Sequence, residues 1–396
     1  MPASPSTARA INDRLALRLL QSEGPLTAGQ LKELTGLSRP SVADLVERLT
    51  AQGLIEVVGE AGAQRRGPNA KLHGIVSGLA HLAALDVRTE GVTLTVADLV
   101  GTVLAEASAP IDDEGGTGPA VERAVTLVER TAKEAGAEPL HTVGIGAPGL
   151  VDPVTGELRD SSGLPEWHRR LVAALHERLP ARVLVENETN LAALAEQRDG
   201  AARDRDTFAL LWLGHGIGAA VVLDGVLRRG ASGGTGEIGF LPVPGTAGLP
   251  SATGCDGGFH SLAGSAAIAE LARAHGLVDP AAAPGEPAAA ALVREAVRAE
   301  PGTPAARFLD ALADRLVLGA ASVVAVLDPG CLVLGGEVGR AGGDRLATLV
   351  ATRLAAMSPL PTEVRAGALG GAAVLRGALL MARDGVQDDL FAPTDR

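Results

Sequence analysis

The sequence predicts an α/β protein with more than one domain, on three observations. With 396 residues the chain is too long for one ordinary hydrophobic core. Helical patterns dominate the first 75 residues, whereas strand-like apolar runs alternate with helical segments and glycine-rich turns over the rest. Hydrophobic residues make up 46% of the chain but aromatic ones only 2%, so aliphatic cores are expected.

The N-terminal segment has the pattern of three helices. Apolar residues at helical spacing over 11–19 predict a first helix that ends near residues 24–25. Thr27 is expected to cap a short second helix that stops at Gly36. Ser38 is expected to cap a third helix, whose apolar residues follow an i, i+3, i+4, i+7 stripe as far as Leu49.

Two short strands are expected to follow these helices, at 54–58 and 71–76. The hairpin between them, GEAGAQRRGPNA, is basic. Helix, short helix, tight turn, helix and basic hairpin together predict a winged helix-turn-helix over residues 1–75. The alternative is a three-helix bundle with a loop and no DNA-binding role. The segment carries nine Lys/Arg and seven Asp/Glu although the chain's net charge is −12, so it differs electrostatically from the rest.

A winged helix-turn-helix would place the start of its third helix against base edges in a major groove and its wing in a minor groove. The candidate DNA contacts near the helix starts are Thr27, Ser38, Arg39, Pro40 and Ser41, with Asp44 and Arg48 as further exposed positions, and those in the wing are Arg65, Arg66, Asn69 and Lys71. Any one of these arginines is equally well read as a solvated surface charge, so the prediction rests on the set.

From residue 76 the chain repeats one α/β pattern twice. The first half is expected to contain strands at 81–88 and 141–147, a hairpin over 91–107, a helix near 119–136 and a strand at 182–187. The stretch 206–230 repeats the opening pattern of strand, glycine turn and second strand. This repetition predicts two lobes, 76–190 and 191–396, with a ligand-binding cleft between them. The Ala/Pro-rich residues 277–290 are expected to form a surface insertion.

Several function classes are disfavoured by composition. Two cysteines, Cys255 and Cys331, do not make a disulfide framework, which fits a reducing compartment. No apolar run of transmembrane length and no signal segment is apparent, so a soluble, cytoplasmic protein without a membrane partner is expected.

Five motifs follow one another along the two predicted lobes. They are GIGAPGLVD at 144–152, SSGLPEW at 161–167, VENETN at 185–190, the glycine-rich stretch 213–239 and LVLGGEVG at 332–339. In this order they resemble the ROK family of repressors, open reading frames and sugar kinases. The resemblance spans nearly the whole chain. It implies a winged helix-turn-helix followed by a two-lobed actin-like ATPase fold of the sugar kinase type, as in the family's sugar-responsive repressors.

The resemblance also shows where the chain departs from the kinases. Their phosphate cradle reads Asp-x-Gly-Gly-Thr, but here Asp86 is followed, after Val87, by Arg88, Thr89 and Glu90. Bulk therefore replaces glycines that let backbone N–H groups approach phosphates. His215 stands where a small hydroxyl residue is usual, and Glu188 stands where the kinases place their catalytic Asp. No kinase activity, catalytic residue or cofactor is expected.

The zinc site of the family is also altered. Phe240 replaces a His that binds both sugar and zinc in the resembled proteins. Of the loop that supplies the other zinc ligands, Ser251, Thr253 and Gly258 fall at cysteine positions, and Cys255 lies out of register. A pairing of Cys255 with His260 gives two ligands at most, whereas structural zinc takes four. The sequence therefore predicts no metal site.

The candidate ligand-binding residues are Gly163, Asn187, Glu188, Glu237 and His260. Asn187 and Glu237 match the family, Glu188 is a conservative change, and Gly163 and His260 are not conservative. Either the pocket is retuned, for a less polar ligand or one whose carboxylate meets His260, or it binds nothing. His260 is equally well read as a packed or exposed histidine.

These inferences predict a DNA-binding transcriptional regulator, in particular a repressor, that senses a sugar or derivative and lacks kinase activity and structural zinc. Its C-terminal lobes are expected to form a homodimer or homotetramer on a palindromic operator. Two alternatives stay open, namely a residual sugar kinase and an effector-free DNA-binding dimer.

Overall fold

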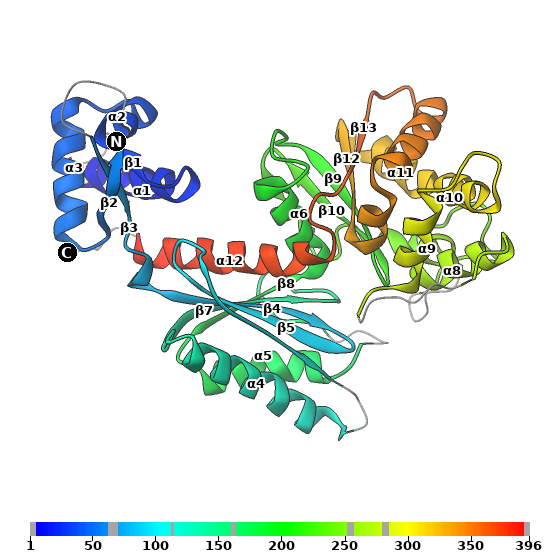
Figure 1. Ribbon diagram of the computed structural model, residues 1–396, viewed down its shortest axis with the longest axis horizontal. Helices are drawn as coiled ribbons and strands as arrows, with labels where there is room; N and C mark the ends of the chain where they lie inside the picture. The colour runs from blue at the N-terminus through cyan, green and yellow to red at the C-terminus, as the bar shows by residue number, and fades with distance from the viewer. Residues whose placement is uncertain are drawn as a thin grey trace.

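The computed structural model describes residues 5–61, 70–111, 115–159, 164–251, 257–278 and 285–391. It consists of an N-terminal head and two lobes (Figure 1). Within those ranges no helix is both long and apolar enough to cross a membrane. We use "head" for the described residues up to 75, "lobe 1" for the sheet of β4–β8 with the helices that cover it, and "lobe 2" for the sheet of β9–β13 with its helices.

The head contains the three predicted helices and the two predicted strands. The helices are α1 (Pro5–Ser22), α2 (Ala28–Thr35) and α3 (Arg39–Ala51), and the strands are β2 (Ile55–Ala61) and β3 (Ala70–Ile75). A further strand, β1 (Leu26–Thr27), pairs antiparallel with β3 and completes a sheet of order β1-β3-β2. Two residues are too few to show a periodicity, so β1 could not be predicted from the sequence.

Both predicted helix caps are confirmed. The Thr27 hydroxyl accepts a hydrogen bond from the Gln30 N–H (3.2 Å), and the Gln30 side chain accepts one from the Thr27 N–H (2.9 Å), which is a capping box. Gly36 ends α2 in the left-handed conformation. The Ser38 hydroxyl accepts from the Ser41 N–H (3.3 Å) at the start of α3. These caps fix the entry and exit of the short α2.

Lobe 1 is a five-stranded sheet of order β6-β5-β4-β7-β8. The β5 strand runs antiparallel to its neighbours β4 and β6, whereas β7 is parallel to β4 and β8 is parallel to β7. Helices α4 and α5 cover one face and α12 the other (Figure 1). The strands are β4 (His81–Arg88), β5 (Gly91–Asp98), β6 (Val103–Pro110), β7 (Leu140–Ala147) and β8 (Arg182–Asn187), and the helices are α4 (Thr117–Glu134), α5 (Trp167–Arg178) and α12 (Ala373–Leu390).

Lobe 2 has the same strand order and directions, β11-β10-β9-β12-β13, so the predicted internal repeat is present. Its strands are β9 (Phe208–Leu213), β10 (Ile217–Leu223), β11 (Val226–Leu227), β12 (Cys331–Gly335) and β13 (Glu363–Ala366). Its helices are α7 (His260–Ala263), α8 (Ser265–Ala274), α9 (Ala288–Ala296), α10 (Pro304–Leu327) and α11 (Gly336–Met357), and α6 (Glu188–Asp199) joins the lobes. Three 3-10 turns, η1 (Ser77–Leu79), η3 (Ile238–Phe240) and η4 (Gly370–Ala372), lie in the connections.

Helix α12 lies on lobe 1, although the predicted division assigned residues 191–396 to the second lobe. Its buried side chains pack on the face of β4 that presents Leu82 and Ala84. The helix backbone comes so close to β7 that a Cβ on Gly144 would lie 2.3 Å from the Ala378 carbonyl oxygen. Chain order therefore does not follow lobe membership here, because the last helix returns to complete the first sheet.

The predicted surface insertion 277–290 also needs correction at its C-terminal end. Residues 279–284 lie outside the described ranges, but Ala288 opens α9, and Ala289 and Ala290 are fully buried in the lobe 2 core. Alanines with no polar atoms suit such a tightly packed helix as well as they suit a surface loop. Composition alone did not distinguish the two.

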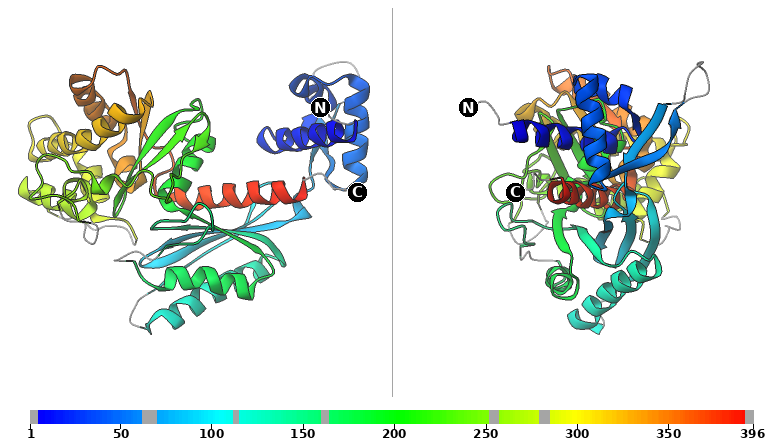
Figure 2. Two further views of the ribbon diagram at one scale, coloured as in Figure 1. Left: turned by 180° about the vertical axis from the view of Figure 1, so that it is seen from behind. Right: turned by 90° about the vertical axis from the view of Figure 1, so that its left-hand side faces the viewer.

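The head rests on lobe 1, at the C-terminal end of α12 (Figure 2). Asp388 of α12 pairs with Arg14 and with Arg18 (3.7 Å), both on α1. Gln21 donates from Nε2 to the Leu99 carbonyl (3.4 Å) in the β5–β6 turn. The first and last helices of the chain are therefore in contact.

Candidate functional site

The cleft between the lobes contains two adjoining cavities, of about 930 and 300 Å³. The larger one is lined by the glycine-rich loop 232–237 and by three residues predicted to bind ligand, Asn187, Glu188 and Glu237. The smaller one is lined by Arg88, Thr89, Glu90, Pro148, His215 and Glu337, together with the four residues shared by both cavities, Leu164, Glu188, Trp212 and Gly216. The sequence-derived sugar position and phosphate position are thus neighbouring parts of one cleft.

Asn187 holds Glu188 at the junction of the two cavities. The Asn187 Oδ1 accepts hydrogen bonds from the N–H groups of Thr189 (2.8 Å) and Asn190 (3.3 Å), so it caps α6. Its Nδ2 donates to the Gly149 carbonyl (2.9 Å), which ties the loop after β7 to the same point. Most of the hydrogen-bonding capacity of Asn187 is therefore used to position Glu188, the first residue of α6.

The two carboxylates of the larger cavity have perturbed acidities. Burial, followed by the charge of Asp86, raises the pKa of Glu188 to about 7. Desolvation also raises the pKa of Glu237, which stands where the glycine-rich loop enters η3. The cavity therefore presents hydrogen-bond acceptors whose negative charge is poorly solvated, an arrangement that suits a ligand rich in donors such as a polyol.

Arg88 bridges the two lobes in the smaller cavity. Its Nε donates to Asp86 (3.0 Å) on the same strand, its Nη1 to Glu337 (2.7 Å) on α11 of lobe 2, and its Nη2 to the Gly371 carbonyl (3.2 Å) in η4. Asp86 is 4% exposed, and burial raises its pKa although Arg88 opposes the shift. In the sequence, Arg88 was identified only as a bulky residue at a position where the kinases have a glycine. Its partners lie 249 and 283 residues away, so no local pattern identified them.

Phe240 faces the larger cavity and is 42% exposed. A phenyl ring neither ligates metal nor donates a hydrogen bond, so the zinc ligand implied by the family resemblance is missing at this position. In the described part of the chain no three His, Cys, Asp or Glu side chains are grouped to hold a metal ion. Thr253 and Cys255 lie outside that part, and Cys331 is buried in β12. The described residues do not fit a tetrahedral zinc site.

His260 is not among the residues that line either cavity of the cleft. It begins α7, where its ring lies 3.0 Å from the position that a Cβ on Gly264 would take. This placement favours the packing interpretation of His260 over a role in meeting a ligand carboxylate. Gly163, the remaining ligand candidate, lies outside the described residues.

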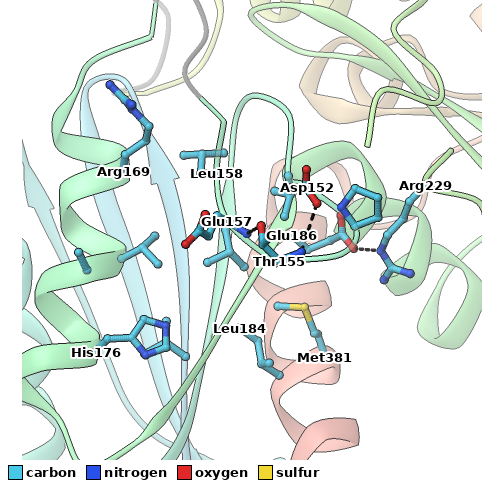
Figure 3. Close-up of a pocket in the computed structure, with 17 residues that line it drawn as sticks. Asp152, Thr155, Glu157, Leu158, Arg169, His176, Leu184, Glu186, Arg229 and Met381 are labelled. Atoms are coloured by element: carbon cyan, nitrogen blue, oxygen red, sulfur yellow. Dashed lines mark hydrogen bonds and ion pairs between the residues drawn. The ribbon is translucent and has the colours of Figure 1, made fainter. Parts of the chain in front are cut away.

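A separate cavity of about 820 Å³ lies beside lobe 1, between α5, β8 and the loop 151–158 (Figure 3). Glu186 on β8 accepts hydrogen bonds from Arg229 of lobe 2 (2.5 Å) and from Asn190 (2.9 Å). Asp152 pairs with Arg159 (2.6 Å). Both carboxylates already have cationic partners, so neither presents an unpaired charge to a ligand. The Glu186–Arg229 pair is instead a second ionic contact between the lobes.

The head presents the start of α3 to solvent. Ser38, Arg39, Pro40 and Ser41 are exposed, whereas Val42, Leu45 and Leu49 on the opposite side form its core. Lys71 is exposed on β3, and Arg65, Arg66 and Asn69 lie outside the described residues. Thr27 is 9% exposed and its hydroxyl is engaged in the capping box.

Asp44 is exposed as expected, whereas Arg48 is only partly exposed and is engaged in ion pairs. Arg48 binds Asp13 of α1 (2.5 Å) and Asp44 (2.5 Å), and its own surface is mostly covered. This pairing makes Arg48 a brace between α1 and α3. It leaves Arg39 as the exposed arginine at the start of the third helix.

Comparisons with known proteins agree with this arrangement. The family model described as ROK family matches residues 82–385, and the model of the MarR family matches residues 11–66. The chain is 28% identical over 243 residues to the DNA-binding transcriptional dual regulator NagC of Escherichia coli, which covers 59% of this chain and 58% of the relative. It is 30% identical over 257 residues to a glucokinase of Thermotoga maritima, covering 59% of this chain and 78% of that enzyme.

A xylose repressor of Bacillus subtilis is 23% identical over 240 residues, 59% of this chain and 61% of the relative. The chain thus spans less than two thirds of the length of the two regulators it matches. Among solved structures, a ROK family transcriptional regulator described as a homolog of the E. coli MLC protein has a TM-score of 0.75 at 20% identity, over 97% of this chain and 98% of that one. A ROK glucokinase of Streptomyces griseus in complex with glucose and AMPPNP has a TM-score of 0.63 at 25% identity. The match covers 77% of this chain and 100% of that one.

The raised pKa of Glu188 predicts a pH-dependent stability that a Glu188→Gln variant should lack. The folded carboxyl has a pKa of about 7 and the unfolded one an ordinary lower value, so the wild type loses stability as pH rises between them. At pH 8 the variant should be more stable than the wild type by on the order of 2 kcal/mol, or a few degrees in Tm. At pH 5 the difference should be much smaller. Thermal melts at both pH values measure this, with Glu295→Gln on the surface as control, and an identical gap at both pH values would contradict the prediction.

Proposed function

The chain belongs to the ROK family, and from that premise we propose that it is a DNA-binding transcriptional regulator, specifically a repressor, whose lobes sense a sugar or sugar derivative. One observation carries the proposal: a winged helix-turn-helix with an exposed third-helix start is joined to a sugar kinase-type cleft in which Arg88 fills the phosphate position. The DNA partner implies a cytoplasmic location.

The head supports DNA reading by its shape and charge. Arg39 and Ser41 are exposed at the N-terminal end of α3, the part of a recognition helix that contacts base edges. Arg48 braces α3 against α1 and so supports the helix without contacting DNA. Arg65 and Arg66 in the wing add positive charge suited to a minor groove.

The cleft supports sensing better than phosphoryl transfer. Transfer depends on positioning phosphates and stabilising their charge. Here two carboxylates, Asp86 and Glu337, share the one guanidinium of Arg88, so that cation is already neutralised. Glu90 adds a further carboxylate to the lining. The phosphates of a nucleoside triphosphate would be repelled by these carboxylates, and we propose that the protein does not use ATP.

The larger cavity supports a sugar-like effector. Glu188 and Glu237 offer acceptors for hydroxyl groups, and Trp212 offers an apolar face. Two of the relatives are named for N-acetylglucosamine and for xylose, which makes a sugar the first class to test. The altered Phe240 fits a protein without structural zinc, and stoichiometric zinc in the purified protein would contradict that part. We further propose that the lobes form a homodimer or homotetramer on a palindromic operator.

DNA selected by the wild-type protein from a random duplex library should contain palindromes with half-sites about one helical turn, or a multiple of it, apart. Arg39→Ala should lose about tenfold or more of the preference for selected over scrambled DNA, because base contacts specify sequence. Arg66→Ala should weaken binding to both duplexes evenly.

Fluorescence anisotropy with both duplexes measures these affinities. Arg298→Ala, on the exposed side of lobe 2, is the control and should bind like the wild type. Equal, sequence-independent losses in Arg39→Ala and Arg66→Ala would show that α3 is not the recognition helix.

The wild-type protein should show no sugar-dependent ATP hydrolysis with glucose, N-acetylglucosamine or xylose in a coupled ADP assay. The physical reason is the neutralised Arg88 and the missing glycine cradle. The Glu188→Ala variant should show the same background rate of ADP formation as the wild type. Turnover that requires sugar and disappears in Glu188→Ala would instead establish a residual sugar kinase.

An effector that fills the larger cavity should raise Tm, by an amount equivalent to about 2.7 kcal/mol when the ligand is a hundredfold above its Kd. A thermal-shift screen of sugars, sugar phosphates and small acids tests this, and Glu237→Gln should reduce the shift while Glu295→Gln should not. If none of these ligands stabilises the wild type, the effector-free dimer is the better description.

A further inference from the structure

Arg88 sits where three parts of the protein meet. It belongs to β4 of lobe 1, contacts Glu337 on α11 of lobe 2, and donates to the carbonyl of Gly371 in η4, directly before α12. The guanidinium donates one hydrogen bond from each of its three nitrogens, to Asp86, Glu337 and Gly371. A planar fork of donors is well suited to hold several acceptors in fixed directions.

The two carboxylates depend on this cation. Asp86 and Glu337 come from different lobes and are both largely covered. Within the described residues, Oδ1 of Asp86 and Oε2 of Glu337 have no hydrogen-bond partner. Removing Arg88 alone would leave two poorly solvated negative charges facing each other, which costs far more than loss of a surface ion pair. The contact is therefore a strong tie between the lobes.

The segment before α12 is contacted by a carboxylate on each of two sides. A Cβ on Gly371 would lie 2.9 Å from Oε1 of Glu337, so the carboxylate packs directly on the backbone there. On the other side, the buried Glu196 of α6 accepts hydrogen bonds from the N–H groups of Ala368 (3.1 Å) and Leu369 (2.9 Å). The residues that lead into α12 are thus held between α6, Arg88 and lobe 2.

Helix α12 extends from this point to the head. Ion pairs join it to α6 through Asp199 (2.6 Å from Arg376) and Arg198 (3.0 Å from Asp384), and to β8 of lobe 1 through Arg182 (3.1 Å from Asp389). Near its end Asp388 contacts Arg14 and Arg18 of the head. Figure 2 shows the helix running from between the lobes to the head. The head is therefore fixed to lobe 1, and its position relative to lobe 2 depends on the angle between the lobes.

We propose that Arg88 is a built-in bridging cation that fixes the angle between the lobes and thereby the position of the head relative to lobe 2. Glu188 and Trp212 line both the cavity of Arg88 and the larger ligand cavity, so an effector in the latter acts directly beside the tie. The consequence for operator binding rests on the proposed function, but the conformational claim does not.

The first experiment compares full-length wild type with Arg88→Met and with Arg178→Met as matched control. Arg178 also bridges two carboxylates, Glu122 and Glu129, but both belong to lobe 1. In Arg88→Met, hydrogen exchange of residues 367–376 should accelerate by about tenfold or more. Its radius of gyration by small-angle X-ray scattering should also increase. Arg178→Met should change neither.

Two further variants keep the test decisive. Asp388→Asn, an exposed change, should accelerate exchange in α1 and leave residues 367–376 as in the wild type. If Arg88→Met does not fold, the triple variant Asp86→Asn/Arg88→Met/Glu337→Gln removes both carboxylate charges together with their cation, which avoids unpaired buried charge. It should show the same faster exchange and larger radius.

The proposal is overturned if the folded Arg88→Met or triple variant has the same hydrogen-exchange rate at residues 367–376 and the same radius of gyration as the wild type. Operator affinity, measured on the duplex selected by the wild type, should change by about fivefold or more in Arg88→Met, which corresponds to a coupling of about 1 kcal/mol. If the wild type selects no DNA, the proposed function fails, while the exchange and scattering results still decide the role of Arg88.

Discussion

Two carboxylates that face each other across the cleft, Asp86 and Glu337, require a cation between them, and Arg88 supplies it from the same strand as Asp86. Arg88 thereby joins the two lobes at the smaller of the two cleft cavities. The cleft that remains is asymmetric. The smaller cavity contains this ion network, and the larger one presents the carboxylates of Glu188 and Glu237.

Local features were predictable because their causes are local. Thr27 and Ser38 were identified as caps since a cap is defined by one side chain and a backbone N–H three residues on. The paired lobes were predictable since each repeats the same succession of strands. Partners far apart in the chain were not: the contacts of Arg88 with Glu337 and of Arg48 with Asp13 have no periodicity that a sequence reveals. The sequence therefore offered Arg48 as a candidate DNA contact and His260 as a candidate ligand contact, whereas in the structure Arg48 is paired with Asp13 and His260 does not line either cavity of the cleft.

The two lobes share one strand topology but differ in what packs against their sheets. One face of the lobe 2 sheet packs with α7–α11 in a core of its own, whereas the other face shares one core with α6, α12, lobe 1 and the head. Helix α12 is paired with β8 of lobe 1 through Arg182 and with α6 through Arg198 and Asp199. Lobe 1 and the head are thus joined to lobe 2 by the Arg88 tie, by the Glu186–Arg229 pair, and by the core in which α6 and α12 pack together.

The return of α12 to lobe 1 has a consequence for synthesis on the ribosome. The strands of lobe 1 are complete at Asn187, but the helix that covers one face of β4 and β7 begins only at Ala373. At roughly 5–20 residues per second, that apolar face waits on the order of 10–40 s for its cover. During this interval the nascent chain exposes Leu82, Ala84 and the bare backbone at Gly144 to other hydrophobic surfaces. The head and lobe 2 form from contiguous segments, so lobe 1 is the part whose folding needs the entire chain and, until then, protection from aggregation.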